Sequence, residues 1–267
     1  MKREPAVAHQ FYPGDPATLR KTLERLIPET VSKQKAIAVV SPHAGYIYSG
    51  SVAGETFAAV EIPRDIVVMG PNHHGYGTPV SLMDQGAWSM PLGEVKINTE
   101  LAGQILAQTD LIEADTLAHR FEHSLEVQVP FLQYLRPDMT ITPMVISHLS
   151  FKSCQVVGEA LAAAIEHYNR PVLIVASSDM THYESRESAT EKDSLAMQQV
   201  MKLDPEGLYS TVLGKKISMC GIMPTTIALI AALRLGATQA RLIRYTDSGE
   251  ASGDTNQVVG YAGFVIS

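Results

Sequence analysis

The chain has 267 residues, which suits one large domain or two small ones, and 45% of them are hydrophobic against 18% charged. This composition can bury a sizeable core and excludes a mostly disordered chain. Lysine and arginine number 21 and aspartate and glutamate 28, giving a net charge of −7. An acidic surface is a poor partner for nucleic acid or for an anionic membrane, so we expect neither.

The sequence carries no sign of export or of membrane insertion. Basic residues open the chain, but the apolar core of a secretory signal does not follow them. The longest strongly apolar stretch, 222–233, is far shorter than the roughly 20 residues that span a bilayer. The two cysteines, Cys154 and Cys220, offer no disulfide framework. We therefore expect a cytoplasmic protein, and the low charged share leaves room for a homo-oligomeric interface.

Hydrophobic periodicity predicts strands and helices that alternate along the chain. A first helix should begin at Asp15 and Pro16, because they are a typical N-cap and first helical residue. Strands are then expected at 36–40, 66–69, 140–146, 172–176, 240–245 and 258–266, and helices at 49–60, 101–108, 123–135, 154–168, 193–202, 205–213 and 223–235. Pro130 should kink or split its helix. Because no linker divides this α/β pattern, we expect a single domain, 1–267, with a mostly parallel, mixed sheet.

Histidines follow three of the predicted buried strands. The first two strands lead to His43 and to the pair His73–His74, and the strand that ends at 176 leads to Asp179 and His182. Ligands of open α/β sheets bind at the carboxyl edge of the strands. If these strands are parallel neighbours, their side chains converge on one site, although spacing alone does not choose between His73 and His74.

The residue types indicate a metal centre. Imidazole is the commonest metal ligand, and two histidines with one anionic ligand leave open positions on a metal. Cys220 precedes a predicted helix, whose N-terminus favours the thiolate, so it can supply the anionic ligand. The alternatives are a hydrogen-bonded turn histidine for His43 and a small buried hydrophobe for Cys220.

Other polar residues near these positions have two interpretations each. His182 suits a catalytic acid or base as well as a ligand. Asp179 either orients an imidazole or caps the following segment. His123 begins the helix predicted at 123–135, where it either faces the site or lies in a solvated first turn. The remaining histidines have no convergent partners in the sequence and stay unassigned: His9, His119, His148 and His167.

The common nucleotide, zincin and serine-hydrolase motifs are missing from the sequence. It has no GxGxxG, no GxxxxGK[ST], no HExxH and no GxSxG. The histidine-rich sheet edge is therefore the strongest chemical signal in the chain.

Several motifs together resemble the Memo (mediator of cell motility) family, whose prokaryotic members are the AmmeMemoRadiSam system protein B. They are AHQFYPGD at 8–15, PHAGYIYSG at 42–50, GPNHHG at 70–75, EHSLEVQVPFLQ at 122–133, SSDMTHY at 177–183, MCG at 219–221 and VVGYAGFVI at 258–266. The resemblance extends over essentially the whole chain, with the motifs in order.

The resemblance implies an α/β/α sandwich similar to class III extradiol dioxygenases of the LigB type. In those enzymes two histidines and a glutamate hold Fe(II), and a further histidine is the acid–base catalyst. Carried over to this sequence, His43 and His73 match the two histidine ligands, and His182 matches the acid–base residue. His123 and Asp179 match polar residues of the same pocket.

This sequence departs from the dioxygenases at the third ligand position, where Cys220 stands in place of the carboxylate. A thiolate is a softer ligand and favours copper or zinc. We therefore expect one redox metal ion per chain, Fe(II) or copper, with zinc as the alternative.

Three functions fit these residues, and the first is the one we favour: a metal-dependent oxidoreductase, dioxygenase-like, with an unknown substrate. The second is a metal-dependent hydrolase that uses the same residues on a water molecule. The third is a non-catalytic module that binds a peptide or partner in a retained pocket. The resemblance also implies a pathway link to radical SAM and AMMECR-type proteins.

Overall fold

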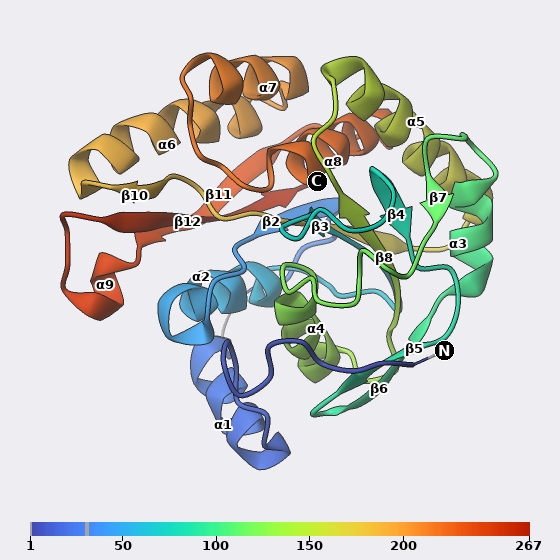
Figure 1. The fold of residues 1–267 in the computed structure, drawn as a ribbon, viewed down its shortest axis with the longest axis horizontal. Coiled ribbons are helices and arrows are strands. Elements are labelled where there is room, and N and C mark those ends of the chain that lie inside the picture. The colour runs from blue at the N-terminus through green and yellow to red at the C-terminus, as the bar shows by residue number, and fades with distance from the viewer. Residues whose placement is uncertain (1, 30–31) are drawn as a thin grey trace.

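The computed structural model describes residues 2–29 and 32–267. A mixed sheet of twelve strands forms the centre of the molecule, and helices flank both of its faces (Figure 1). This architecture confirms the α/β class predicted from the sequence. No helix within the described residues has the length and apolar character needed to cross a membrane.

The elements follow one another as strands and helices along most of the chain. The strands are β1 (Lys2–Arg3), β2 (Ala38–Ser41), β3 (Asp65–Pro71), β4 (Val80–Leu82), β5 (Ala87–Met90), β6 (Gly93–Ile97), β7 (Glu113–Ala114), β8 (Thr140–Ile146), β9 (Val172–Ser177), β10 (His182–Glu184), β11 (Ala240–Asp247) and β12 (Val258–Ile266). The helices are α1 (Pro16–Leu26), α2 (Tyr46–Ala58), α3 (Thr99–Leu106), the 3₁₀ helix η1 (Glu126–Gln128), α4 (Val129–Leu135), α5 (Phe151–Tyr168), α6 (Arg186–Met201), α7 (Pro205–Gly214), α8 (Ile222–Arg234) and α9 (Gly249–Ser252).

Four parallel strands occupy the middle of the sheet in the order β8-β3-β9-β2, and β12 continues the sheet antiparallel to β2. The middle strands are apolar on both faces because helices cover both faces. In β3, for example, Val67 and Met69 face one core, whereas Ile66 and Val68 face the other. The near-continuous apolar runs therefore predict these strands correctly.

The helices form two layers, one on each face of the sheet (Figure 1). Helices α3, α5, α6, α7 and α8 pack on one face and bury the larger core. Helices α1, α2 and α4 pack on the opposite face with the hairpin β5–β6. Asp15 caps α1 by accepting a hydrogen bond from the Thr18 backbone N–H, as the sequence predicts.

The structure differs from the sequence-based prediction between residues 123 and 135. His123 does not begin a helix but lies in a turn before η1, and Pro130 stands in the first turn of α4, where its missing N–H costs nothing. The sequence did not predict the short strands β4, β5, β6, β7 and β10. Each of them pairs with a neighbour toward an edge of the sheet, and this pairing, not the periodicity of its own residues, makes it a strand.

Helices α1 and α2 approach closely at Gly54. A Cβ atom on Gly54 would lie 2.0 Å from the backbone oxygen of Leu26, the last residue of α1. Backbone cannot yield as the end of a flexible side chain can, so only glycine fits there. Gly54 thus determines how near α1 lies to α2.

We expect Gly54→Ala to lower the free energy of unfolding by about 1–3 kcal/mol or more, because the methyl group must push α1 away from α2. The matched control is Gly103→Ala in α3, where an added Cβ meets no atom within 4 Å. That variant should gain about 0.5–1 kcal/mol from helix propensity. Urea denaturation measures both, and equal effects would contradict this account of α1–α2 packing.

Candidate metal centre

Three neighbouring parallel strands deliver polar side chains to the same edge of the sheet. Strand β9 lies between β2 and β3, so the ends of all three are adjacent. His43 follows β2, His73 follows β3, and Asp179 follows β9. The carboxyl edge of the sheet therefore brings together residues that are more than a hundred positions apart in the sequence.

His43, His73 and His123 form a group in which each offers one ring nitrogen, and these nitrogens all lie within 4.8 Å of one another. The ring centroids of His73 and His123 are 4.6 Å apart and nearly stacked, and His43 meets both rings edge-on at 5.3 and 5.6 Å. His74 is exposed and stacks on Tyr76 instead. Of the two adjacent histidines, His73 is thus the one that faces the group.

The carboxylate of Glu122 orients His73. It accepts hydrogen bonds from the His73 ring Nδ1 at 2.8 Å and from the His73 backbone N–H at 2.7 Å. Burial alone would raise the pKa of Glu122, but these bonds and the Ser124 N–H outweigh it and hold the pKa well below its usual range. Because the ionised carboxylate can only accept, His73 carries a proton on Nδ1, and in the neutral ring Nε2 is the bare nitrogen that can bind a metal.

A buried relay sets the tautomer of His43. The Ser177 hydroxyl donates to the Ser124 carbonyl at 2.6 Å and accepts from the Gln128 amide at 2.7 Å. Its remaining lone pair faces the His43 Nδ1 at 2.9 Å, so the ring must donate there. His43, like His73, therefore presents a bare Nε2, which is the form that binds a metal.

Burial keeps His43 and His123 neutral. It lowers the pKa of His43 well below its usual value, and the neighbouring His73 and His123 lower it further. Burial also lowers the pKa of His123 to about 4, although Glu122 opposes the shift. Phe11, from the N-terminal segment, covers His123 with ring centroids 4.9 Å apart. Neutral imidazoles bind metal ions without first releasing a proton.

Cys220 lies beside the histidine group, with its sulfur 3.3 Å from the His43 Nε2. The sequence suggested that a helix N-terminus would favour its thiolate. In the structure Cys220 precedes Gly221, the N-cap of α8, and burial together with the nearby Asp179 raises the thiol pKa well above its usual value. Without a cation the thiol is therefore protonated, and a bound metal would have to displace that proton.

Gly221 lets the Cys220 segment lie directly against the end of β9. A Cβ atom there would be 2.3 Å from the Ser177 carbonyl oxygen, and the Gly221 N–H donates to the Ser178 hydroxyl at 3.1 Å. The glycine of the MCG motif is thus needed for close approach, which brings the sulfur of Cys220 to the site.

Asp179 holds the main chain of His43, not its ring. Its Oδ1 accepts from the His43 backbone N–H at 2.7 Å, and its own N–H donates to the Cys220 sulfur at 3.3 Å. Burial raises the pKa of Asp179 to about 6, and the His43 N–H limits that rise. Asp179 therefore joins the loops after β2 and β9 to the Cys220 segment.

His182 is tied to the segment that precedes Cys220. Its Nδ1 lies 2.9 Å from the Ser218 carbonyl oxygen, and its backbone N–H donates to the Ser218 hydroxyl at 2.8 Å. Since a carbonyl only accepts, the proton is on Nδ1 and the Nε2 of His182 is free to accept one. This is the arrangement that an acid–base residue needs.

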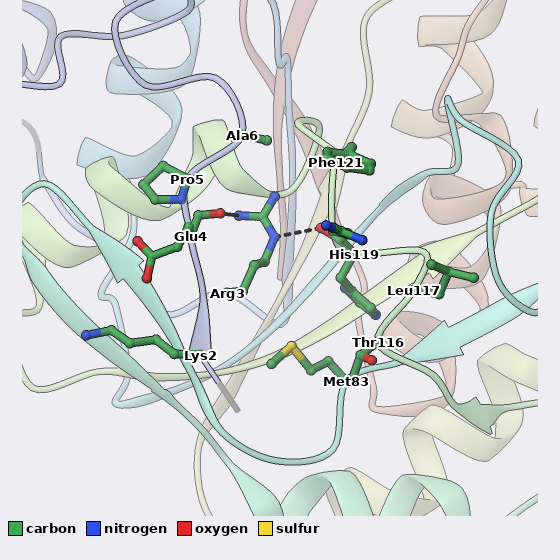
Figure 2. A pocket seen from close by; sticks show the side chains of 11 residues that line it. Lys2, Arg3, Glu4, Pro5, Ala6, Met83, Thr116, Leu117, His119 and Phe121 are labelled. Carbon is green, nitrogen blue, oxygen red and sulfur yellow. Dashed lines mark hydrogen bonds between the residues drawn. The ribbon is translucent and has the colours of Figure 1, made fainter.

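The N-terminal segment clamps the loop that carries His123. Arg3 is buried and pairs with the buried Glu126 at 2.7 Å, and its guanidinium also donates to the carbonyl oxygens of His119 and Glu122. Figure 2 shows Arg3 pointing across to this loop, beside a cavity of about 630 Å³. The hydroxyl of Tyr12 donates to Glu126 at 2.6 Å and fastens the same segment.

Four residues of the site were not singled out by the sequence-based reasoning: Phe11, Glu122, Ser177 and Gln128. Glu122 directly precedes His123 in the sequence, and a carboxylate next to a candidate ligand is a signal for an orienting partner. All four lie within the motifs that carry the family resemblance. Their roles depend on contacts between distant segments, which spacing does not reveal.

The fold and the site define an α/β protein with a histidine-rich candidate metal centre at the carboxyl edge of its sheet. The chain belongs to the Memo family, because a sequence model of the Memo-like proteins matches residues 3–265. A MEMO1 family protein of Methanopyrus kandleri is 39% identical over 280 residues, covering 100% of this chain and 99% of its own. One from Aquifex aeolicus is 41% identical over 266 residues, covering 99% and 98%.

A solved structure shows a similar fold. The crystal structure of an uncharacterized protein from Escherichia coli K12 aligns with a TM-score of 0.53, covering 86% of this chain and 100% of that one. The sequence identity is 14%, so this likeness extends to the fold alone.

We expect Ser177→Ala to weaken metal binding about 10- to 100-fold, because His43 then loses the acceptor that keeps its Nε2 bare. Competition with a chelating dye measures the affinity. Ser194→Ala is the control, since that hydroxyl bonds only backbone carbonyls of α6. Unchanged affinity in a folded Ser177→Ala protein would refute the relay.

A second expectation concerns acid stability. Burial, with Arg3 nearby, lowers the pKa of His119 to about 4, against 6.5 in an unfolded chain. Between these values the unfolded state binds a proton and the folded state does not, so stability falls as the pH drops from about 6.5 to about 4. The loss attributable to His119 is of order 3 kcal/mol at most.

His119→Gln should show a shallower decline of unfolding free energy over this pH range. His148→Gln, which removes an exposed histidine, should keep the parent slope. Urea titrations at pH 7, 5.5 and 4.5 compare the three proteins. If the unfolding free energy of all three proteins falls equally with pH, His119 does not cause the loss of acid stability.

Proposed function

We propose that this protein is a metal-dependent redox protein that holds one iron or copper ion at the carboxyl edge of its sheet. The convergence of His43, His73 and His123 within 4.8 Å carries the proposal, with the Cys220 sulfur next to His43. Membership of the Memo family is shown by the comparisons, whereas the metal and the redox activity are our inference.

The side chains present fit such an ion. Two imidazoles have their Nδ1 protons committed to Glu122 and Ser177, so their Nε2 atoms face the centre bare. A thiol within reach adds a soft ligand, which suits copper, or iron in a sulfur-containing site. We assign His43, His73 and Cys220 as ligands, and the ring nitrogen of His123 lies close enough to His43 and His73 to be a fourth.

When bound, the metal would supply electron transfer and polarise a substrate oxygen. The protein residues have separate tasks. His182 can take up a proton at Nε2 and return it, because its Nδ1 keeps its own proton in a hydrogen bond to the Ser218 carbonyl oxygen. Asp179 keeps His43 and Cys220 in place through backbone hydrogen bonds. Phe11 shields His123 from water on the side of the N-terminal segment.

Elemental analysis of protein purified without oxygen or chelators tests the proposal. We expect close to one iron or copper per chain in the wild type, and at least a fivefold loss in His43→Ala and in Cys220→Ala. His74→Ala should retain the metal, because that exposed ring faces away from the group. Circular dichroism confirms that each variant is folded.

The outcomes separate the three functions. Iron or copper lost in both variants supports the redox proposal and justifies a search for O₂-dependent substrates. Stoichiometric zinc would support the hydrolase instead, because zinc has no redox chemistry. A wild type that takes up none of these metals, even when they are added, would refute both enzymes and leave the binding module.

A further inference from the structure

A second cavity lies at the opposite edge of the sheet from the metal centre. It has a volume of about 690 Å³, which is within the usual range for small-molecule sites. Most residues of its wall stand just before or at the start of β2, β3 and β9, and the others lie in or at the ends of helices α4, α5 and α8. Strand β9 has six residues, so about 20 Å of strand separates the two edges at ~3.3 Å per residue.

The cavity wall combines an apolar surface with a group of cations. Four different connections each contribute one basic side chain, and the apolar surface comes from strand starts and helix ends. The cations are Lys35, Arg64, Arg136 and Arg170, and the apolar residues are Ile37, Ile62, Ile165, Val172 and Leu235. In a chain whose net charge is −7, such a convergence of basic residues stands out.

The nearby carboxylates leave part of this positive charge available. Asp65 is buried and directs its oxygens to Asn98, Thr140 and Tyr168, so it forms no ion pair with the cavity cations, although its charge acts on Arg170 from nearby. Lys35 and Arg64 form no ion pair with any described residue. Glu61 is the remaining acidic residue of the wall, and it is exposed.

The two other cations of the wall already contact neighbouring side chains. The Arg170 guanidinium lies 4.1 Å above the Tyr168 ring and pairs with Glu100. Arg136 pairs with Asp138 at 2.7 Å. Both ion pairs are exposed and therefore weak, so an anionic ligand can compete with Glu100 and Asp138 for the guanidinium groups.

We propose that this cavity binds a small amphipathic anion, an alkyl carboxylate or alkyl phosphate, at a site separate from the metal centre. The alkyl chain lies on the isoleucine, valine and leucine side chains, where burial contributes about 25 cal/mol per Å². The anionic group lies at the mouth, where Lys35 and Arg64 provide unpaired charge and the arginines provide directed N–H donors.

Titration calorimetry with decanoate and decyl phosphate, both below micelle formation, tests the proposal. We expect one site per chain for at least one of them, and the tighter of the two identifies the head group. Decanol has the same chain without charge, and inorganic phosphate has the charge without the chain. Both should bind at least tenfold more weakly.

The double variant Lys35→Gln/Arg64→Gln should weaken binding of the anion at least tenfold. Lys202→Gln/Lys215→Gln is the matched control, because it removes the same charge from exposed positions outside the cavity and should leave the affinity unchanged. His43→Ala should also bind normally, so failure of the metal-centre proposal does not affect this one. Absent binding, equal losses in the two double variants, or decanol binding as tightly as decanoate would each overturn the proposal.

Discussion

One buried carboxylate, that of Glu122, joins the two halves of the candidate site. Taking a carboxylate out of water costs several kcal/mol unless hydrogen bonds replace its hydration. Here the replacement comes from both the ring and the backbone of His73 and from the backbone of Ser124. The requirement to satisfy Glu122 therefore fixes the loop after β3 against the loop before η1. His73 and His123 are brought face to face by the same contact.

A second buried carboxylate, Glu126, extends this constraint to the N-terminus. It accepts from the Arg3 guanidinium, the Tyr12 hydroxyl and two backbone N–H groups of the same segment. The segment from Arg3 to Tyr12 thus supports the site, although none of its residues is among the proposed metal ligands. Removing Arg3 would leave the buried charge of Glu126 without its cation, which is far more costly than losing an exposed ion pair.

The protonation states of the site have a common cause. Burial favours neutral imidazoles at His43 and His123 and a neutral thiol at Cys220. The imidazoles are therefore ready to bind a metal, whereas the thiol must lose a proton on binding. Hydrogen bonds that the two rings donate to Ser177 and Glu122 then decide which ring nitrogen faces the centre. Burial and hydrogen bonding together therefore set the protonation states with which these side chains meet a metal.

The sequence by itself determined the α/β class and the middle strands, because buried parallel strands are apolar throughout. It also placed His43, His73 and His182 after the ends of these strands, because the strands end abruptly in polar turns. The motifs also identified the family. Only the tertiary structure decided that His123 stacks on His73, that Ser177 sets the tautomer of His43 and that burial opposes the thiolate of Cys220. Those properties depend on which distant segments meet and how much water they exclude. The pattern of residues along the chain does not show which segments meet or how much water they exclude.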